Sequence, residues 1–187
     1  RAVGVAAFGA YGTAAALAVI LSITATLGMM QLLVRDLAQQ PARATSLIGA
    51  ANLAKAGSSL LMLAALLLLA GWVLGYPRDT VAAAMLLGLA YAVGAFAENI
   101  GAYFQSIERM GVWMQAQAAF GLVTGSLGIA LVLATRSIVW FCAAPVVGQL
   151  AAHGWLALRA PPGVRGAWRA TWPEVRRLLR SLVPFAA

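Results

Sequence analysis

The stretch SSLLMLAALLLLAGWVLG, residues 58–75, decides the fold class of this sequence. It carries no charged residue, and it has the length of roughly 18 residues that marks a membrane-spanning helix. Similar apolar runs recur along the 187 residues, of which 63% are hydrophobic and only 10% are charged, with a mean hydropathy of +0.88. Soluble domains are about half apolar and a quarter charged. The sequence therefore predicts an all-α, polytopic transmembrane helix bundle.

Five membrane spans are predicted between the polar breaks of the chain. They cover residues 10–34, 47–74, 81–104, 112–134 and 138–158, and a sixth span is expected to start near Leu182. This divides the chain into a transmembrane bundle (1–158), a basic amphipathic connector (159–181) and the start of the next span (182–187). The absence of an initiator methionine and the apolar ending suggest that both ends were cut from something longer.

The basic residues predict the orientation of these spans, because Lys and Arg accumulate in cytoplasmic loops. Nine of the thirteen fall on one side, and these are Arg35, Arg43, Arg109, Arg159, Arg165, Arg169, Arg176, Arg177 and Arg180. The other side holds Arg1, Arg78 and Arg136, and Lys55 lies within a span. The side with nine is predicted to be cytoplasmic. The net charge of +8 then reflects loop topology and attraction to anionic lipids, and nucleic acid is not an expected partner.

The connector is predicted to form a basic helix on the cytoplasmic leaflet. Thr171 and Glu174 have the T-x-x-E spacing of a capping box, and Pro173 suits a first turn. Arginines are expected on the other faces of an interfacial helix whose apolar residues recur at helical spacing. These apolar residues are Trp168, Trp172, Val175 and Leu179.

Two charged residues lie inside predicted spans, where charge is costly and usually functional. Lys55 precedes the turn at Pro77 by 22 positions, and Glu98 follows it by 21. Antiparallel neighbours equally far from their turn lie at similar depth, so the sequence predicts a Lys55–Glu98 ion pair or a shared wet cavity. Asn52 and Asn99 extend this polar lining. The alternative is that both charged groups snorkel to the headgroups without a transport role.

Other features predict packing and no active site. Gly71 with Gly75, and Gly121 with Gly125, have the small-xxx-small spacing that lets helices approach closely. Cys142 has no partner cysteine, and His153 has no cluster beside it, so no metal site is expected. No nucleophile–base pair, paired carboxylates or nucleotide motif is present in the sequence, so neither a catalytic residue nor a cofactor is predicted.

The order of motifs resembles that of Wzx-type polysaccharide flippases. The early region of that family has an Arg-x-Leu-Gly element, a Phe/Tyr-Gly-x-Tyr turn, a Leu-Gly pair and an Arg-acid-Leu-Ala exit. The matching residues are Arg1, Gly4, Phe8, Gly9, Tyr11, Leu27, Gly28, Arg35, Asp36, Leu37 and Ala38. Val3 stands where the family usually has leucine. The segments AYFQSIERM (102–110) and LLRSLVPFAA (178–187) resemble a later turn and the entry to the family's seventh span.

The resemblance implies membership of the multidrug/oligosaccharidyl-lipid/polysaccharide exporter superfamily, whose members have two six-helix lobes around a cavity. This chain would hold the second to sixth spans and the start of the seventh. The implied activity is translocation of an undecaprenyl-pyrophosphate-linked oligosaccharide across the bacterial inner membrane, for surface polysaccharides such as the O-antigen of lipopolysaccharide. Lys55, with Arg35 or Arg109 near the mouth, would contact the phosphates. Polysaccharide polymerase and glycosyltransferases are the implied partners, beside membrane lipids.

Three other classes of function remain open from the sequence. A cation-coupled multidrug exporter of the same superfamily could use Glu98 as a proton or sodium site. A non-transporting scaffold subunit would use the same polar residues only to hold helices together. A membrane acyl- or glycosyltransferase is disfavoured, because the loops lack a His-Asp or acidic-pair signature.

Overall fold

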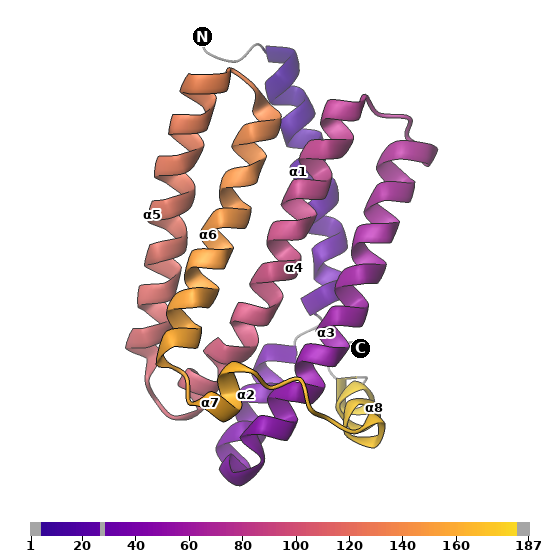
Figure 1. Cartoon of the computed structure of the whole chain (residues 1–187). Helices are drawn as coiled ribbons and strands as arrows, with labels where there is room; N and C mark the ends of the chain where they lie inside the picture. Colours follow the sequence, from indigo (N-terminus) through magenta and orange to yellow (C-terminus); the bar gives the residue numbers. More distant parts are fainter. Residues whose placement is uncertain (1–4, 27–28, 183–187) are drawn as a thin grey trace.

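The computed structural model describes residues 5–26 and 29–182, and these form helices joined by short turns, with no strand among them (Figure 1). A 3-10 turn, Pro41–Arg43, precedes α3, and a π-helical segment, Leu68–Val73, continues it. The helices are α1 Val5–Thr26, α2 Met29–Gln39, α3 Ala44–Leu67, α4 Arg78–Ser106, α5 Met110–Thr135, α6 Ile138–Arg159, α7 Pro162–Arg165 and α8 Trp172–Leu182.

Four helices of the described chain are long and apolar enough to cross a membrane by length and composition. They are α3 with its 3-10 and π-helical extensions (Pro41–Val73), α4, α5 and α6, and α1 adds a shorter apolar stretch, Phe8–Ile23. The fold is therefore the predicted transmembrane helix bundle. The four helices coincide with the second to fifth predicted spans.

The predicted first span, 10–34, corresponds to two helices, α1 and α2, on either side of residues 27–28, which lie outside the described residues. α2 is amphipathic. Leu32, Leu33 and Leu37 are buried, whereas Arg35 and Gln39 face outward. A helix with one polar face suits the end of the bundle better than the hydrocarbon core. The predicted start of the sixth span, 182–187, overlaps the described chain only at Leu182, which ends α8, and residues 183–187 lie outside the described residues.

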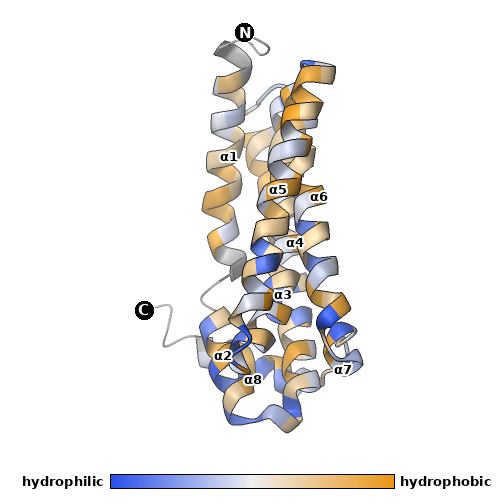
Figure 2. Cartoon of the chain, turned by 90° about the vertical axis from the view of Figure 1, so that its left-hand side faces the viewer, coloured by the Kyte–Doolittle hydropathy of each residue, from blue (hydrophilic) through white to orange (hydrophobic). Residues whose placement is uncertain are grey.

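α4 occupies the centre of the bundle and packs against α1, α2, α3 and α6. α5 pairs mainly with α6 at the edge (Figure 1). The turns after α2 and α4 lie at one end of the bundle, together with α7 and α8, and the turns after α3 and α5 lie at the other end. Hydrophilic residues are concentrated at the first end (Figure 2).

The loops thus alternate between the two ends, as the basic residues predict. All nine arginines assigned to the cytoplasmic side lie at or beyond the end that holds α2, α7 and α8, whereas Arg78 and Arg136 lie in the opposite turns. Arg1 lies outside the described residues.

Within the part of the chain that the structure describes, the glycine pairs predicted to mediate helix contacts face open space. A Cβ atom added at Gly71, Gly75, Gly121 or Gly125 would meet no atom of another helix within 4 Å. Close approaches occur instead at isolated glycines, where a Cβ would collide with a side chain of a neighbouring helix. These include Gly88 against Leu66, Gly101 against Trp113, Gly148 against Thr124 and Phe120, and Gly163 against Thr45. The motif spacing was misleading, because any apolar helix rich in small residues produces it.

The predicted apolar face of the connector helix is also wrong in part. Trp168 precedes α8 and packs against Phe96 with tilted rings, whose centroids lie 5.5 Å apart. Val175 is buried together with Leu178, because α8 packs against α3. Trp168, Trp172 and Leu179 remain exposed. Of the four residues predicted to form the apolar face of the helix, only Val175 is therefore buried within the protein.

Candidate functional site

An ion pair between a buried lysine and a partly exposed glutamate joins α3 and α4 inside the membrane-spanning bundle. Lys55 Nζ lies 2.8 Å from Glu98 Oε2 and donates a second hydrogen bond of 2.9 Å to the carbonyl of Ala95. The Lys55 side chain is 0% exposed, whereas that of Glu98 is 32% exposed. This confirms the predicted ion pair. It contradicts snorkelling of Lys55, because a snorkelling ammonium would reach the surface.

The hairpin of α3 and α4 sets this pairing. The π-helical end of α3 leads through Gly75, whose φ of 61° favours glycine, to Pro77 and the start of α4. The two helices then run back along each other, so residues equally far from the turn meet. The depth argument made from the sequence therefore holds in three dimensions.

A second polar contact lies one turn away from the ion pair. Asn99 Nδ2 donates a hydrogen bond of 2.8 Å to Asn52 Oδ1, and Asn52 Nδ2 donates one of 2.8 Å to the carbonyl of Ala167 in the connector. Both amides are buried. We call Asn52, Lys55, Glu98 and Asn99 the polar network. Its link to Ala167 was not predicted, because nothing in the sequence pairs residues 115 positions apart.

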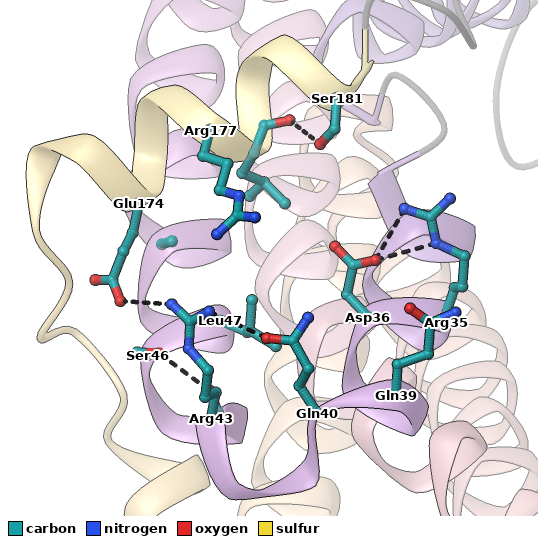
Figure 3. A pocket seen from close by; sticks show the side chains of 12 residues that line it. Arg35, Asp36, Gln39, Gln40, Arg43, Ser46, Leu47, Glu174, Arg177 and Ser181 are labelled. Carbon is teal, nitrogen blue, oxygen red and sulfur yellow. Dashed lines mark hydrogen bonds and ion pairs between the residues drawn. The ribbon is translucent and has the colours of Figure 1, made fainter.

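Arg35 lies outside this network, on α2, where it forms an ion pair of 2.9 Å with Asp36. The pair lines a cleft of about 240 Å³ between α2, the start of α3 and α8 (Figure 3). Arg43 bridges the cleft, since it donates hydrogen bonds to Gln40 Oε1 at 3.0 Å and to Glu174 Oε1 at 3.3 Å. Arg177 points into it from α8 (Figure 3).

Of the residues that line this cleft, only Arg35 was predicted from the sequence as a site residue. The capping box offered a signal, because it fixes Glu174 at the start of α8. Glu174 Oε2 accepts hydrogen bonds from the backbone N–H of Thr171 at 2.8 Å and from its hydroxyl at 3.1 Å, which confirms the predicted capping interaction. The hydrogen bond from the Thr171 N–H is the main reason why the pKa of Glu174 is lowered, and the Thr171 hydroxyl and Arg43 add to it.

Arg109 occupies a third position. It is exposed at the start of α5, in the turn that follows α4. This turn lies at the same end of the bundle as Arg35 (Figure 1). The six predicted site residues thus divide into the polar network of four inside the bundle and two arginines at the basic end.

Comparison with known families gives this arrangement a biological setting. The model of a family described as "Polysaccharide biosynthesis protein" matches residues 1–160. The chain belongs to the polysaccharide biosynthesis protein family. This confirms the resemblance to Wzx-type flippases that its motifs indicate. Searches of curated proteins and of solved structures each gave no significant match.

Family membership and the apolar helices together support a multi-pass membrane protein that acts as a transporter in polysaccharide synthesis. Its described residues contain no group of three or more His, Cys, Asp or Glu side chains that could hold a metal ion. The chemistry available in the polar network is charge pairing and hydrogen bonding.

Proposed function

We propose that this polysaccharide biosynthesis protein translocates a lipid-linked oligosaccharide, of the undecaprenyl-pyrophosphate class, from the cytoplasmic to the outer leaflet of the bacterial inner membrane. The cargo would serve surface polysaccharides such as O-antigen. The observation that carries the proposal is a fully buried lysine paired with a partly exposed carboxylate inside the bundle of a protein of this family. Intramembrane charges of this kind mark transport pathways.

The polar network supplies what such a cargo needs. A pyrophosphate is a strong acceptor for an ammonium group, and it can replace the Glu98 carboxylate beside Lys55. Asn52 and Asn99 offer amide groups that suit glycan hydroxyls, while the prenyl chain stays in lipid. Arg35 and Arg109, at the basic end, are placed to meet the anionic headgroup first. The expected motion is rocking of one helical lobe against another.

In this proposal the protein is a transporter and not an enzyme. The oligosaccharide arrives complete from cytoplasmic glycosyltransferases, and a polymerase on the outer side uses it. Both are proposed partners. Membrane lipids are further partners, because the basic end with Trp172 exposed on α8 suits an anionic leaflet.

A cation-coupled multidrug exporter is the second candidate, and the exposure of Glu98 favours it. A carboxylate that is 32% exposed beside a buried ammonium can exchange its partner for a proton or a sodium ion. A scaffold subunit is the third candidate, in which the same contacts only hold α3 and α4 together. The three candidates differ in what neutral variants of the pair do to transport.

The test uses the full-length protein at its native locus, with Lys55→Met, Glu98→Gln and the double variant. The measurements are surface polysaccharide, lipid-linked oligosaccharide retained on the cytoplasmic side, drug efflux, and protein level in the membrane. Gln117→Leu, on the exposed face of α5, is the control for loss of a polar group within a span.

We expect each single variant to lower surface polysaccharide by roughly tenfold at normal protein level, with retained lipid-linked precursor. The double variant should lower surface polysaccharide by less than the product of the two single-variant fold-reductions, because the partners are coupled. Normal polysaccharide in both single variants would overturn the flippase proposal and favour the scaffold. Normal polysaccharide with lost drug efflux would favour the exporter.

A further inference from the structure

We propose that residues 166–182 form a strap whose docking on α3 sets the geometry of the polar network through Asn52, so that release of the strap loosens the Lys55–Glu98 pair. The strap comprises α8 and the non-helical segment before it. Its place in a transport cycle rests on the proposed function, whereas its coupling to Lys55 can be tested without transport.

The base of the strap is fixed to the bundle. Arg165, at the end of α7, donates hydrogen bonds to the carbonyls of Leu158 and Ala160 at 3.1 and 3.3 Å. These are orphan acceptors at the C-terminal end of α6, so the guanidinium caps that helix. Motion of the strap therefore pivots after Arg165.

The strap touches α3 backbone to backbone at Gly49. A Cβ atom added at Gly49 would lie 2.7 Å from the carbonyl oxygen of Arg169 and 3.1 Å from its carbonyl carbon. Because backbone atoms cannot rotate aside as a flexible side chain can, any larger residue at position 49 must displace the strap. Gly57, two turns further along the same helix, has no atom within 4 Å of such a Cβ.

One amide links the strap to both helices of the network. Asn52 belongs to α3, donates to the strap at Ala167 and accepts from Asn99 of α4. Asn99 adjoins Glu98, and Asn52 lies three residues before Lys55 on the same helix. If Ala167 moves away, a buried amide loses its acceptor, and an unpaired buried donor is costly. Asn52 must then turn, and its contact with Asn99 changes. Asn52 is thus a positioning residue for the network.

The remaining contacts of the strap are individually weak, so it can be released. Arg43 and Glu174 form its outer ion pair at 3.3 Å, with side chains 43% and 26% exposed. Exposed pairs of this kind contribute little, about 0 to 1 kcal/mol. The buried apolar side chains of the strap are Ala167, Val175 and Leu178, and the Trp168 ring lies against Phe96 with centroids 5.5 Å apart. A segment held by few apolar contacts and surface polar pairs is the kind that opens locally.

The cleft in Figure 3 is part of this latch. Two of its guanidiniums already pair with its two carboxylates, as Arg35–Asp36 and Arg43–Glu174. The second pair spans the gap between α3 and the strap. The charges of the cleft are thus largely matched within the protein, which suits a lock between elements.

The test exploits the fact that Lys55 is the only lysine in this sequence. The full-length protein in lipid nanodiscs, with Cys142→Ala, is treated with a membrane-permeant amine-acylating ester, and modification of Lys55 is followed by peptide mass spectrometry. Strap position is followed by electron spin distances between labels on Leu53→Cys in α3 and Leu179→Cys in α8, both exposed positions. The variants are Gly49→Ala, Asn52→Leu and the matched control Gly57→Ala.

We expect Gly49→Ala to lengthen and broaden the label distance and to raise acylation of Lys55 by roughly tenfold, the change that about 1.4 kcal/mol produces in an equilibrium constant. Asn52→Leu should raise acylation as well, and Gly57→Ala should change neither reading. A displaced strap with unchanged acylation in Gly49→Ala would overturn the coupling.

An unmoved strap in Gly49→Ala would overturn the docking. If that variant fails to reach the membrane, Asn52→Leu decides, because unchanged acylation there is equally contrary to the proposal. Acylation is independent of cargo, so failure of the flippase proposal leaves this result standing.

Discussion

At the scale of single residues, Lys55 shows what a buried charge in this bundle requires. A lysine at the centre of a spanning helix costs about 2.5 to 3.5 kcal/mol on insertion scales. Here two of its three ammonium hydrogens have acceptors, the Glu98 carboxylate and the Ala95 carbonyl. The pairing offsets part of the cost of placing the charge there. Removing one partner is therefore more harmful than removing both.

Glu174 gives a prediction about pH at the same scale. Its folded pKa is depressed below the ordinary value of 4.5, mainly by the N–H of Thr171. The carboxylate's contribution to α8 is thus fully present above pH 4.5 and is lost as pH falls through the lower folded value. We expect the distance between the labels on Leu53→Cys and Leu179→Cys to lengthen on acidification. In Glu174→Gln this distance should already be longer at neutral pH and should change little further in acid.

Asp36→Asn is the control for that measurement. It removes the other carboxylate of the cleft without touching the α8 cap, so it should keep the dependence on pH. An acid response that survives Glu174→Gln unchanged would assign the effect to another group.

At the scale of elements, helix contacts in this bundle depend on where a glycine faces a bulky partner. A Cβ at Gly101 of α4 would collide with the ring of Trp113 at the start of α5. This places the ring directly on the α4 backbone. Overfilling such a contact forces side chains or helices apart, typically at about 1 to 3 kcal/mol.

We therefore predict that Gly101→Ala lowers the thermal unfolding temperature of the purified protein in detergent. Gly121→Ala, on α5 with open space around it, should leave that temperature unchanged or raise it slightly, because Ala favours helix. Equal effects of the two substitutions would show that the Trp113 contact does not hold α4 and α5 together.

At the scale of the whole molecule, the loops alternate between a strongly basic end and a weakly charged one. This predicts the orientation in the membrane. In intact cells, a membrane-impermeant thiol reagent should label Arg78→Cys and Arg136→Cys from outside, whereas Arg43→Cys and Arg109→Cys should react only after the membrane is permeabilised. Cys142 is buried and is a suitable internal background. Labelling of Arg43→Cys from outside would show that the orientation is the reverse of the predicted one.

Much of this architecture follows from local patterns. Long apolar runs bounded by charged residues predicted the positions of α3, α4, α5 and α6. Equal spacing about Pro77 predicted Lys55 beside Glu98, because residues equally far from the turn of an antiparallel hairpin lie at the same depth. The capping box located the start of α8 for a similar reason, since its hydrogen bonds lie within one turn. The depth of these charges and the helix cap depend only on consecutive helices and on residues within one turn.

The rest was decided by packing between distant segments. Burial of Val175, the glycines that face neighbouring helices, and the hydrogen bond from Asn52 to Ala167 all depend on which surfaces meet. In a chain this apolar, most faces of the spanning helices are hydrophobic and rich in small residues. Hydrophobic pattern and glycine spacing therefore do not show whether a face contacts lipid or another helix. The residue pattern along the chain is enough to predict its membrane-spanning helices and the matched depth of Lys55 and Glu98. Which helix faces touch depends on the folded arrangement, because shape and single buried hydrogen bonds select among faces of similar composition.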